Sequence, residues 1–185
     1  MQSKYPEIGV CGLSCRLGPG YVIKTKSKCP GCKTDYRLGG PCIMLHCAVK
    51  RAIEFYGDCT EKLNCEKWKK HRESGKSHDS FKCYQKLEDD INYIEKFGLD
   101  EFRKSQKLRE KLLLLMLDNF NDGRSKSYYC IAATVFKTDE LEKAIEKATN
   151  MSIGLDIFDK ILFSFFFYFM LKNPRCFISM VAISN

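Results

Sequence analysis

Apolar residues in the middle of the chain recur at intervals of three and four, a spacing that predicts amphipathic helices. The first such stripe consists of Tyr84, Leu87, Ile91, Ile94 and Phe97. Gly98 follows the stripe directly, and a glycine in this place commonly marks a helix end. We therefore expect one helix that ends at residue 97.

A second helix is expected to begin at Asp100, whose side chain can cap free backbone N–H groups, and to end at the turn of residues 121–123. Its apolar positions are Phe102, Leu108, Leu112, Leu115 and Met116. The stretch from Leu112 to Leu115 is apolar on every side, so we expect it to be packed between other elements.

The apolar pattern after this turn does not decide between a helix and a strand. Residues 128–136 are mostly apolar and rich in β-branched and aromatic types, which fits either a helix or a strand. A short helix is expected from Thr138 onwards, with Leu141, Ile145 and Ala148 on one face.

Residues 161–171 form an uncharged stretch of eleven residues, which would be about 16 Å long as a helix. A bilayer core requires roughly 30 Å, so no transmembrane span is expected. Three interpretations of residues 151–185 stay open: a packed helix, a segment at a membrane interface, or a non-native tail such as a shifted reading frame would produce.

The composition suits a folded chain, because 44% of the 185 residues are hydrophobic and 29% are charged. We expect a mainly α fold with a small α+β character, in which a cysteine-rich metal-binding module with zinc-knuckle turns precedes a helical part. The expected division is residues 1–80 for the cysteine-rich module, 81–150 for a helical segment packed on it, and 151–185 for the apolar tail.

Cysteine placement is the main chemical signal of the sequence. Eight of the 11 cysteines form four close pairs in the first third of the chain: Cys11 with Cys15, Cys29 with Cys32, Cys42 with Cys47, and Cys59 with Cys65. In Cys29-Pro-Gly-Cys32 a single tight turn can direct both thiolates to one metal. The sequence before Cys11 has no apolar core of signal-peptide length, so we expect a cytoplasmic protein. Clustered thiols in a reducing compartment indicate metal ligands rather than disulfides.

A tetrahedral structural zinc takes four thiolates, so two Zn²⁺ ions would use all eight ligands. The grouping stays open. Sequential sites would join the first pair to the second and the third to the fourth, whereas interleaved sites would join the first pair to the third. An iron–sulfur cluster is the alternative cofactor, because it accepts the same donors.

The formal net charge of +8 arises mainly before residue 81, in a segment that contains 15 basic and 8 acidic residues. Basic side chains near the cysteines can offset thiolate charge and donate to sulfur. The segment Lys67-Trp68-Lys69-Lys70-His71-Arg72 also fits a nucleic-acid surface, which is possible but not favoured. On a helix, Trp68 would face Cys65 and would pack on the metal site.

The run CGLSC, then KCPGC, Cys42-x4-Cys47 and a last pair near CEKWKK resembles a widespread prokaryotic cysteine-rich family with the signature CGLxC, classified as a domain of unknown function. The resemblance covers about residues 9–72, and residues 121–133 are similar to the C-terminal segment of its longer subgroup. It implies metal binding with no established activity. Gly18 and Tyr56 stand where many members have further cysteines, which would leave eight ligands here.

From these observations we expect a metal-stabilised binding or scaffold module that acts on a protein partner. The alternative is an iron–sulfur or thiol redox protein, and a lesser alternative is a zinc protein that binds nucleic acid. The observations favour a protein without enzymatic activity, because eight thiolates in two closed sites leave no open coordination position. The sequence also lacks a nucleophile elbow and a metal-binding histidine pair.

Overall fold

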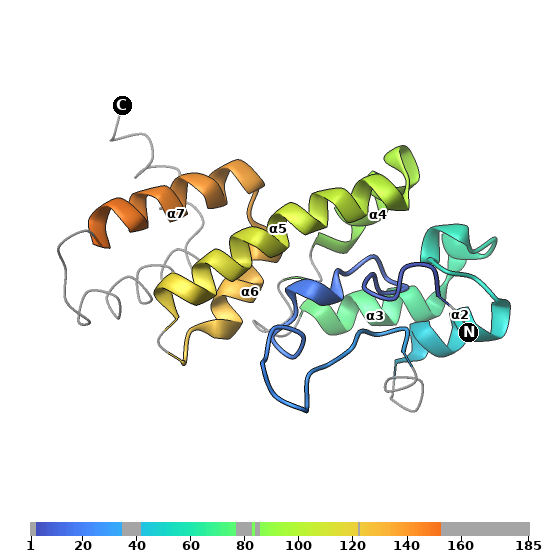
Figure 1. Cartoon of the computed structure of the whole chain (residues 1–185). Coiled ribbons are helices and arrows are strands. Elements are labelled where there is room, and N and C mark those ends of the chain that lie inside the picture. The colour runs from blue at the N-terminus through green and yellow to red at the C-terminus, as the bar shows by residue number, and fades with distance from the viewer. Residues whose placement is uncertain (1–2, 35–41, 77–82, 84–85, 122, 153–185) are drawn as a thin grey trace. The chain divides into compact units, whose positions relative to one another are not determined.

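The computed structural model of the chain describes residues 3–34, 42–76, 83, 86–121 and 123–152 (Figure 1). Within these residues the fold is helical, with six α-helices, three short 3-10 helices and no β-strand. The α-helices are α2 (Ile43–Arg51), α3 (Glu66–Lys76), α4 (Leu87–Phe97), α5 (Leu99–Phe120), α6 (Lys126–Val135) and α7 (Thr138–Ser152). The expectation of a mainly α protein is confirmed, and the described residues contain one isolated β-bridge, between Ile8 and Ser14.

The helix ends follow the sequence signals closely. Helix α4 ends before Gly98, whose φ of 85° lies in the region that favours glycine and whose N–H donates to the Ile94 carbonyl at 2.7 Å. Helix α5 begins one residue later and runs to Phe120, as expected. The ambiguous segment 128–136 is helical over most of its length, in α6. The predicted tail at 151–185 lies almost entirely outside the described residues.

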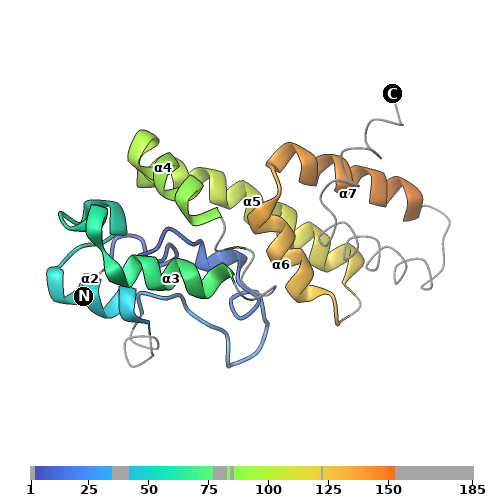
Figure 2. The same ribbon diagram turned by 180° about the vertical axis from the view of Figure 1, so that it is seen from behind.

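The chain divides into two compact units between Glu110 and Lys111, inside α5. The first unit takes in the cysteine-rich segment together with α2, α3, α4 and the first half of α5. Within this unit α2 and α3 lie side by side in both views (Figures 1 and 2). Its core joins apolar residues from all these parts: Tyr5, Ile8, Val10, Met44, Leu45, Ala48, Phe55, Tyr56, Ile91, Ile94 and Phe102.

The second unit is a helical arrangement of the end of α5 with α6 and α7. Its buried residues are Leu112, Leu113, Met116, Phe120, Tyr129, Cys130, Ala132, Ala133, Leu141 and Ala148. The Tyr129 hydroxyl donates to the Phe120 carbonyl at 3.0 Å, and both partners are buried. In the turn before α6, the Asn121 side chain accepts from the Gly123 N–H at 3.1 Å and from the Ser125 hydroxyl at 3.3 Å.

One packing expectation is wrong. Leu114 and Leu115 are 46% and 47% exposed, whereas Leu112 and Leu113 are buried. The physical reason is helix periodicity: the buried face of α5 in this stretch runs through Leu113, Met116 and Phe120, so residues 114 and 115 point away from it. None of the helices within the described residues is both long enough and apolar enough to cross a bilayer.

Candidate metal centre

A tight loop of residues 7–15 sets the position of the first two cysteines. The Cys15 N–H donates to the Glu7 carbonyl at 2.8 Å, and the Gly9 N–H donates to the Leu13 carbonyl at 2.8 Å. Gly12 adopts a φ of 89° at the turn, a conformation that glycine accepts at little cost. Cys11 therefore lies in the bend of this loop and Cys15 at its end, where the 3-10 helix Cys15–Leu17 begins.

The Cys29-Pro-Gly-Cys32 turn packs against the same segment. Gly31 has a φ of 120°, and a Cβ atom at this position would lie 2.7 Å from the Pro6 carbonyl oxygen. Only glycine fits both the conformation and the close approach. The Cys32 N–H points to the Cys15 sulfur at 3.3 Å, so the glycine turn directs a backbone donor to sulfur as expected from the sequence.

We call Cys11, Cys15, Cys29, Cys32 and Cys42 the first thiol group, because each of the others contributes to the pKa of Cys11 or of Cys15. The Sγ atoms of Cys15 and Cys32 are 3.2 Å apart. A Cβ atom on Gly9 would lie 3.4 Å from the Cys11 sulfur and 3.9 Å from the Cys32 sulfur, so both thiols border the same glycine. The Cys15–Cys32 separation lies between the roughly 2.05 Å of a disulfide bond and the roughly 3.8 Å between two sulfurs on one tetrahedral zinc.

Other thiols of the first thiol group contribute to the pKa values of Cys11 and Cys15. Burial raises the pKa of Cys11 to about 12, and the thiolates of Cys32 and Cys42 add to this rise. The pKa of Cys15 is lowered, chiefly by its hydrogen bond with Cys32, although burial and the charges of Cys11 and Cys29 act in the opposite direction. Such mutual repulsion between thiolates is what a bound cation would relieve.

Helix α2 separates the two members of the third pair. Cys42 is the N-cap residue of α2 and is exposed, whereas Cys47 lies within the helix and is half-buried. Cys42 stands outside the helix in extended backbone, with φ of -74° and ψ of 99°, so the regular rotation of α2 does not set the direction of its side chain. The charge of Cys42 acts on Cys11, whereas Cys47 lines a pocket that Cys42 does not border.

That pocket contains the second thiol group, which we define as Cys47, Cys59 and Cys65. The remaining lining residues are Val10, Met44, Ala48, Ile53, Tyr56 and Lys67. Cys59 follows the 3-10 helix Tyr56–Asp58 directly, and Cys65 follows the 3-10 helix Lys62–Asn64, so two short turns bring the last pair to the wall of α2. Three of the eight predicted ligands thus line this pocket, and the other five do not border it.

Basic side chains act on the second thiol group. The Lys67 ammonium donates to the Cys47 sulfur at 3.4 Å. Burial alone would raise the pKa of Cys47, but hydrogen bonds from Lys67 and Arg51 lower it below its ordinary value. Arg51 is itself held by Glu61, at 2.5 Å. This is the donation from basic residues to sulfur that the sequence predicts.

Trp68 and Tyr56 form an aromatic wall beside the second thiol group. Their rings stack with centroids 4.3 Å apart, and the Tyr56 hydroxyl donates to the Lys62 carbonyl at 2.6 Å. Burial raises the pKa of Tyr56 to about 12, and the thiolates of Cys65 and Cys59 contribute to this rise. Trp68 thus packs on the residues around Cys65, as its helical position predicts.

The same contacts occupy the segment that could have contacted nucleic acid. Trp68 is half-buried in its stack, Lys69 pairs with Glu66, and Arg72 pairs with Glu88. A stacking platform for bases needs an accessible aromatic face. Helix α3 therefore uses its aromatic ring and much of its basic charge for contacts within the protein.

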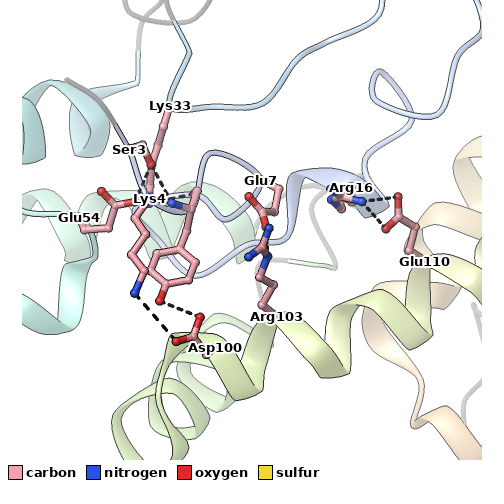
Figure 3. Close-up of polar contacts among 10 residues, drawn as sticks. Ser3, Lys4, Glu7, Arg16, Lys33, Glu54, Asp100, Arg103 and Glu110 are labelled. Carbon is pink, nitrogen blue, oxygen red and sulfur yellow. Dashed lines mark hydrogen bonds and ion pairs between the residues drawn. The ribbon is translucent and has the colours of Figure 1, made fainter.

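A buried ion pair anchors the Cys29–Cys32 turn. The Lys33 side chain is fully buried, and its ammonium lies 2.9 Å from Glu54 and 3.3 Å from the Tyr5 carbonyl. Glu54 also accepts from the Ser3 hydroxyl at 2.5 Å and from the Tyr5 N–H at 3.0 Å (Figure 3). One carboxylate therefore joins three segments: the chain start, the cysteine turn and the loop after α2.

A row of polar contacts joins the N-terminal segment to α5. In Figure 3, Glu7 faces Arg103 and Arg16 faces Glu110, at successive positions along the helix. Tyr5 donates to Asp100 at 2.9 Å, Glu7 pairs with Arg103 at 2.5 Å, and Arg16 pairs with Glu110 at 2.8 Å. Asp100 is thus used for this contact rather than as the helix cap that the sequence predicts. The row holds the loop that carries Cys11 and Cys15 against one helix face.

The donor set fits a thiophilic metal, since zinc and iron–sulfur clusters both take thiolates. No three histidine, cysteine or acidic side chains among the described residues converge closely enough to hold a metal ion as they stand. The metal sites therefore stay a prediction. Their formation requires the thiols of each group to move toward a common point.

Sequence reasoning missed four residues that shape this centre: Lys33, Glu54, Tyr56 and Lys67. Glu54 and Lys33 are separated by 21 residues, so no local pattern links them. Tyr56 was noted for its position but not as a pocket wall. Lys67 stands two residues after the predicted ligand Cys65, which is a local signal, yet the sequence does not say which sulfur it contacts. His46, which precedes Cys47, is exposed.

Comparisons of the chain with protein-family models, with curated proteins and with solved structures found no match. The resemblance to the CGLxC family therefore stays a prediction that rests on the cysteine motifs alone.

Proposed function

We propose that the first unit is a zinc-binding module in which the metal orders the cysteine-rich loops, so that the unit can present them to a protein partner in a reducing compartment such as the cytoplasm. The observations that support this are the 3.2 Å separation of the Cys15 and Cys32 sulfurs and the pocket that Cys47, Cys59 and Cys65 line together. In both places, cysteines from different pairs of the sequence lie near one another.

The surroundings of the thiols favour a structural role for the metal. Residues 3–34 contain one 3-10 turn and no longer element, and their backbone hydrogen bonds belong to turns and loop contacts rather than to a longer helix or a sheet. Segments of this kind order when metal ligation supplies the missing free energy. The polar anchors at Glu54 and along α5 position these segments but leave the thiols themselves in contact with one another.

A second candidate function is a thiol redox protein, and the contact of the Cys15 and Cys32 sulfurs at 3.2 Å specifically favours it. The two thiols could form a disulfide by exchange with oxidised glutathione, which would take up the two electrons and the two thiol protons and leave as two molecules of reduced glutathione. An iron–sulfur cluster on the first thiol group is the related alternative, and it uses the same donors.

Anaerobic purification followed by elemental analysis and a visible spectrum separates these functions. We expect two zinc ions per chain and no visible absorption. Brown protein with iron and sulfide would instead support the cluster, and metal-free protein with a Cys15–Cys32 disulfide after exposure to oxidised glutathione would support the redox function. Either result would overturn the zinc module.

The structural role is tested by removing one ligand. Cys32→Ser should lose one zinc and should raise hydrogen exchange throughout residues 3–34, because the loops lose their common anchor. Cys83→Ser is the matched control, since Cys83 is a half-buried thiol that belongs to neither group. Equal zinc content and equal exchange in the two variants would contradict the proposal.

A further inference from the structure

The loop between Gly20 and Cys29 carries three lysines at alternate positions: Lys24, Lys26 and Lys28. We propose that this loop, which we call the lysine loop, binds an acidic segment of a partner protein. The inference rests on the proposed presentation of the cysteine-rich loops to a protein partner, and it names the chemistry of the surface that this partner offers.

Backbone hydrogen bonds give the lysine loop a defined shape. The Cys29 N–H donates to the Gly20 carbonyl at 2.8 Å and closes the loop at its base. The Lys28 N–H donates to the Thr25 carbonyl at 3.0 Å, which forms a turn. In both views the loop extends away from α2 and α3 (Figures 1 and 2). Residues 24–28 are all exposed, so a partner can reach the three ammonium groups.

The positive charge of the lysine loop is not balanced by the acidic residues around it in the sequence. Residues 8–34 contain five basic residues and no acidic one. Two of the five already have partners, since Arg16 pairs with Glu110 and Lys33 pairs with Glu54. Within the part of the chain that the structure describes, no ion pair involves the three lysines of the loop. Their charges therefore add to one another and attract an anionic partner.

The surroundings of Tyr21 favour recognition of charge over the stacking of nucleic-acid bases. The Lys28 ammonium lies 4.6 Å from the centre of the Tyr21 ring, and the Arg16 guanidinium lies 6.0 Å from it. Tyr21 is also half-buried. Base stacking needs an accessible aromatic face, so a base would compete with these cations for the ring.

Val22 and Ile23 add a small apolar area beside the lysines in the sequence. Both residues are half-buried, so part of each remains accessible. Protein interfaces combine an apolar centre with a polar rim, whereas contacts to a phosphate backbone are mainly polar. We therefore expect the partner segment to carry carboxylates together with apolar side chains.

The test uses the full chain and a fluorescein-labelled peptide of glutamates with a leucine at every fourth position, and binding is followed by fluorescence anisotropy. The lysine-loop variant carries Lys24→Gln, Lys26→Gln and Lys28→Gln. Because three exposed charge pairs are lost, we expect its affinity for the peptide to fall about tenfold. The affinity of the parent chain should also fall as salt is added, since ions screen exposed charges.

A matched control variant separates the position of the lysines from their contribution to the net charge. It carries Lys107→Gln, Lys143→Gln and Lys147→Gln, which remove the same charge from exposed positions in α5 and α7. Its affinity for the peptide should change less than about twofold. A peptide with serine in place of each leucine should bind the parent chain more weakly than the leucine peptide does. Equal losses of affinity in the two variants, or equal affinity for the two peptides, would overturn the inference.

Two other anionic ligands test the class of the partner. Oligothymidylate of the same charge as the peptide, or vesicles with phosphatidylserine, should bind the parent chain more weakly than the leucine peptide does. Tighter binding of either one that is lost in the lysine-loop variant would overturn the assignment to a protein partner.

The zinc content of the parent chain and of the lysine-loop variant is measured in parallel and should be equal. A chain without zinc that still binds the peptide through the lysine loop overturns the zinc-binding module and supports this inference. A chain that contains zinc but does not bind the peptide overturns this inference alone.

Discussion

The two units of this chain reach a folded state by different means. The second unit buries a regular apolar face on each of its helices, and its described polar contacts are mostly local. The first unit has an apolar core as well, but residues 3–34 are held largely by side chains that reach across the sequence, such as Glu54, Arg103 and Glu110. Residues 3–34 lack a periodic apolar pattern, so individual side-chain contacts determine the conformation of their backbone.

The comparison implies that single polar substitutions damage the first unit more than the second. The largest effect is expected from Lys33→Met, which leaves the Glu54 carboxylate without its buried cation. We expect a loss of about 3 kcal/mol in the free energy of unfolding of the first unit, since breaking a buried pair strands the other charge. Urea denaturation followed by hydrogen exchange, resolved by unit, measures the loss.

Two further variants make this test specific. Lys33→Met combined with Glu54→Gln should recover part of the loss, because the stranded charge is removed. Lys104→Met breaks an exposed pair with Glu101 and should cost at most about 0.5 kcal/mol. Equal losses for Lys33→Met and Lys104→Met would show that the buried anchor does not hold the first unit together.

An intermediate effect is expected at Asp90 in α4. Burial, the largest cause, raises the pKa of Asp90 from 3.8 to about 7, although Arg109 and Lys86 act in the opposite direction. The folded state therefore binds the proton more tightly than the unfolded state, and stability falls as the pH rises from about 4 to about 7. Asp90→Asn removes this pH-dependent loss of stability, because asparagine does not ionise.

We expect Asp90→Asn to stabilise the first unit by about 2 kcal/mol at pH 8 and to make little difference at pH 4. Unfolding of the variant and of the parent chain at both pH values gives the difference directly. Asp89→Asn, at an exposed position one residue earlier, is the matched control and should show no such pH dependence. A gain that is equal at pH 4 and pH 8 would show that proton binding at Asp90 is not its cause.

The smallest effect is expected in the second unit. Tyr129→Phe removes the hydrogen bond to the Phe120 carbonyl but keeps the buried ring, so we expect a loss of about 1 kcal/mol in this unit. Hydrogen exchange of residues 126–152 should increase, while residues 3–34 provide an internal reference that stays unchanged. A larger loss here than in Lys33→Met would reverse the comparison between the units.

The same difference explains how much could be predicted from the sequence. Helices α4 and α5 were predicted almost to the residue, because the spacing of Ile91 and Ile94 and the stop at Gly98 are local signals. The helical nature of α6 was left open, since a short apolar run has no decisive period. Leu114 and Leu115 were placed wrongly, because local hydrophobicity does not show which face of a helix meets other elements.

The eight candidate ligands were proposed from their residue type and spacing, and their grouping was left open. Both groupings keep Cys42 with Cys47, but Cys47 lines a pocket with Cys59 and Cys65 that Cys42 does not border. The contact between the Cys15 and Cys32 sulfurs joins residues 17 positions apart. Contacts of this kind depend on the whole fold rather than on any one segment.

The close approach of Gly31 to the Pro6 carbonyl has a consequence for the variation that this protein can tolerate. A library with all amino acids at position 31 should return glycine almost alone among folded chains, because a Cβ atom would displace the backbone of the opposite segment. The adjacent Pro30 is exposed, and a library there should return many residue types. Positions 30 and 31 of the Cys29-Pro-Gly-Cys32 motif would thus differ sharply in mutational tolerance. The invariant position would be the glycine, which has no side chain.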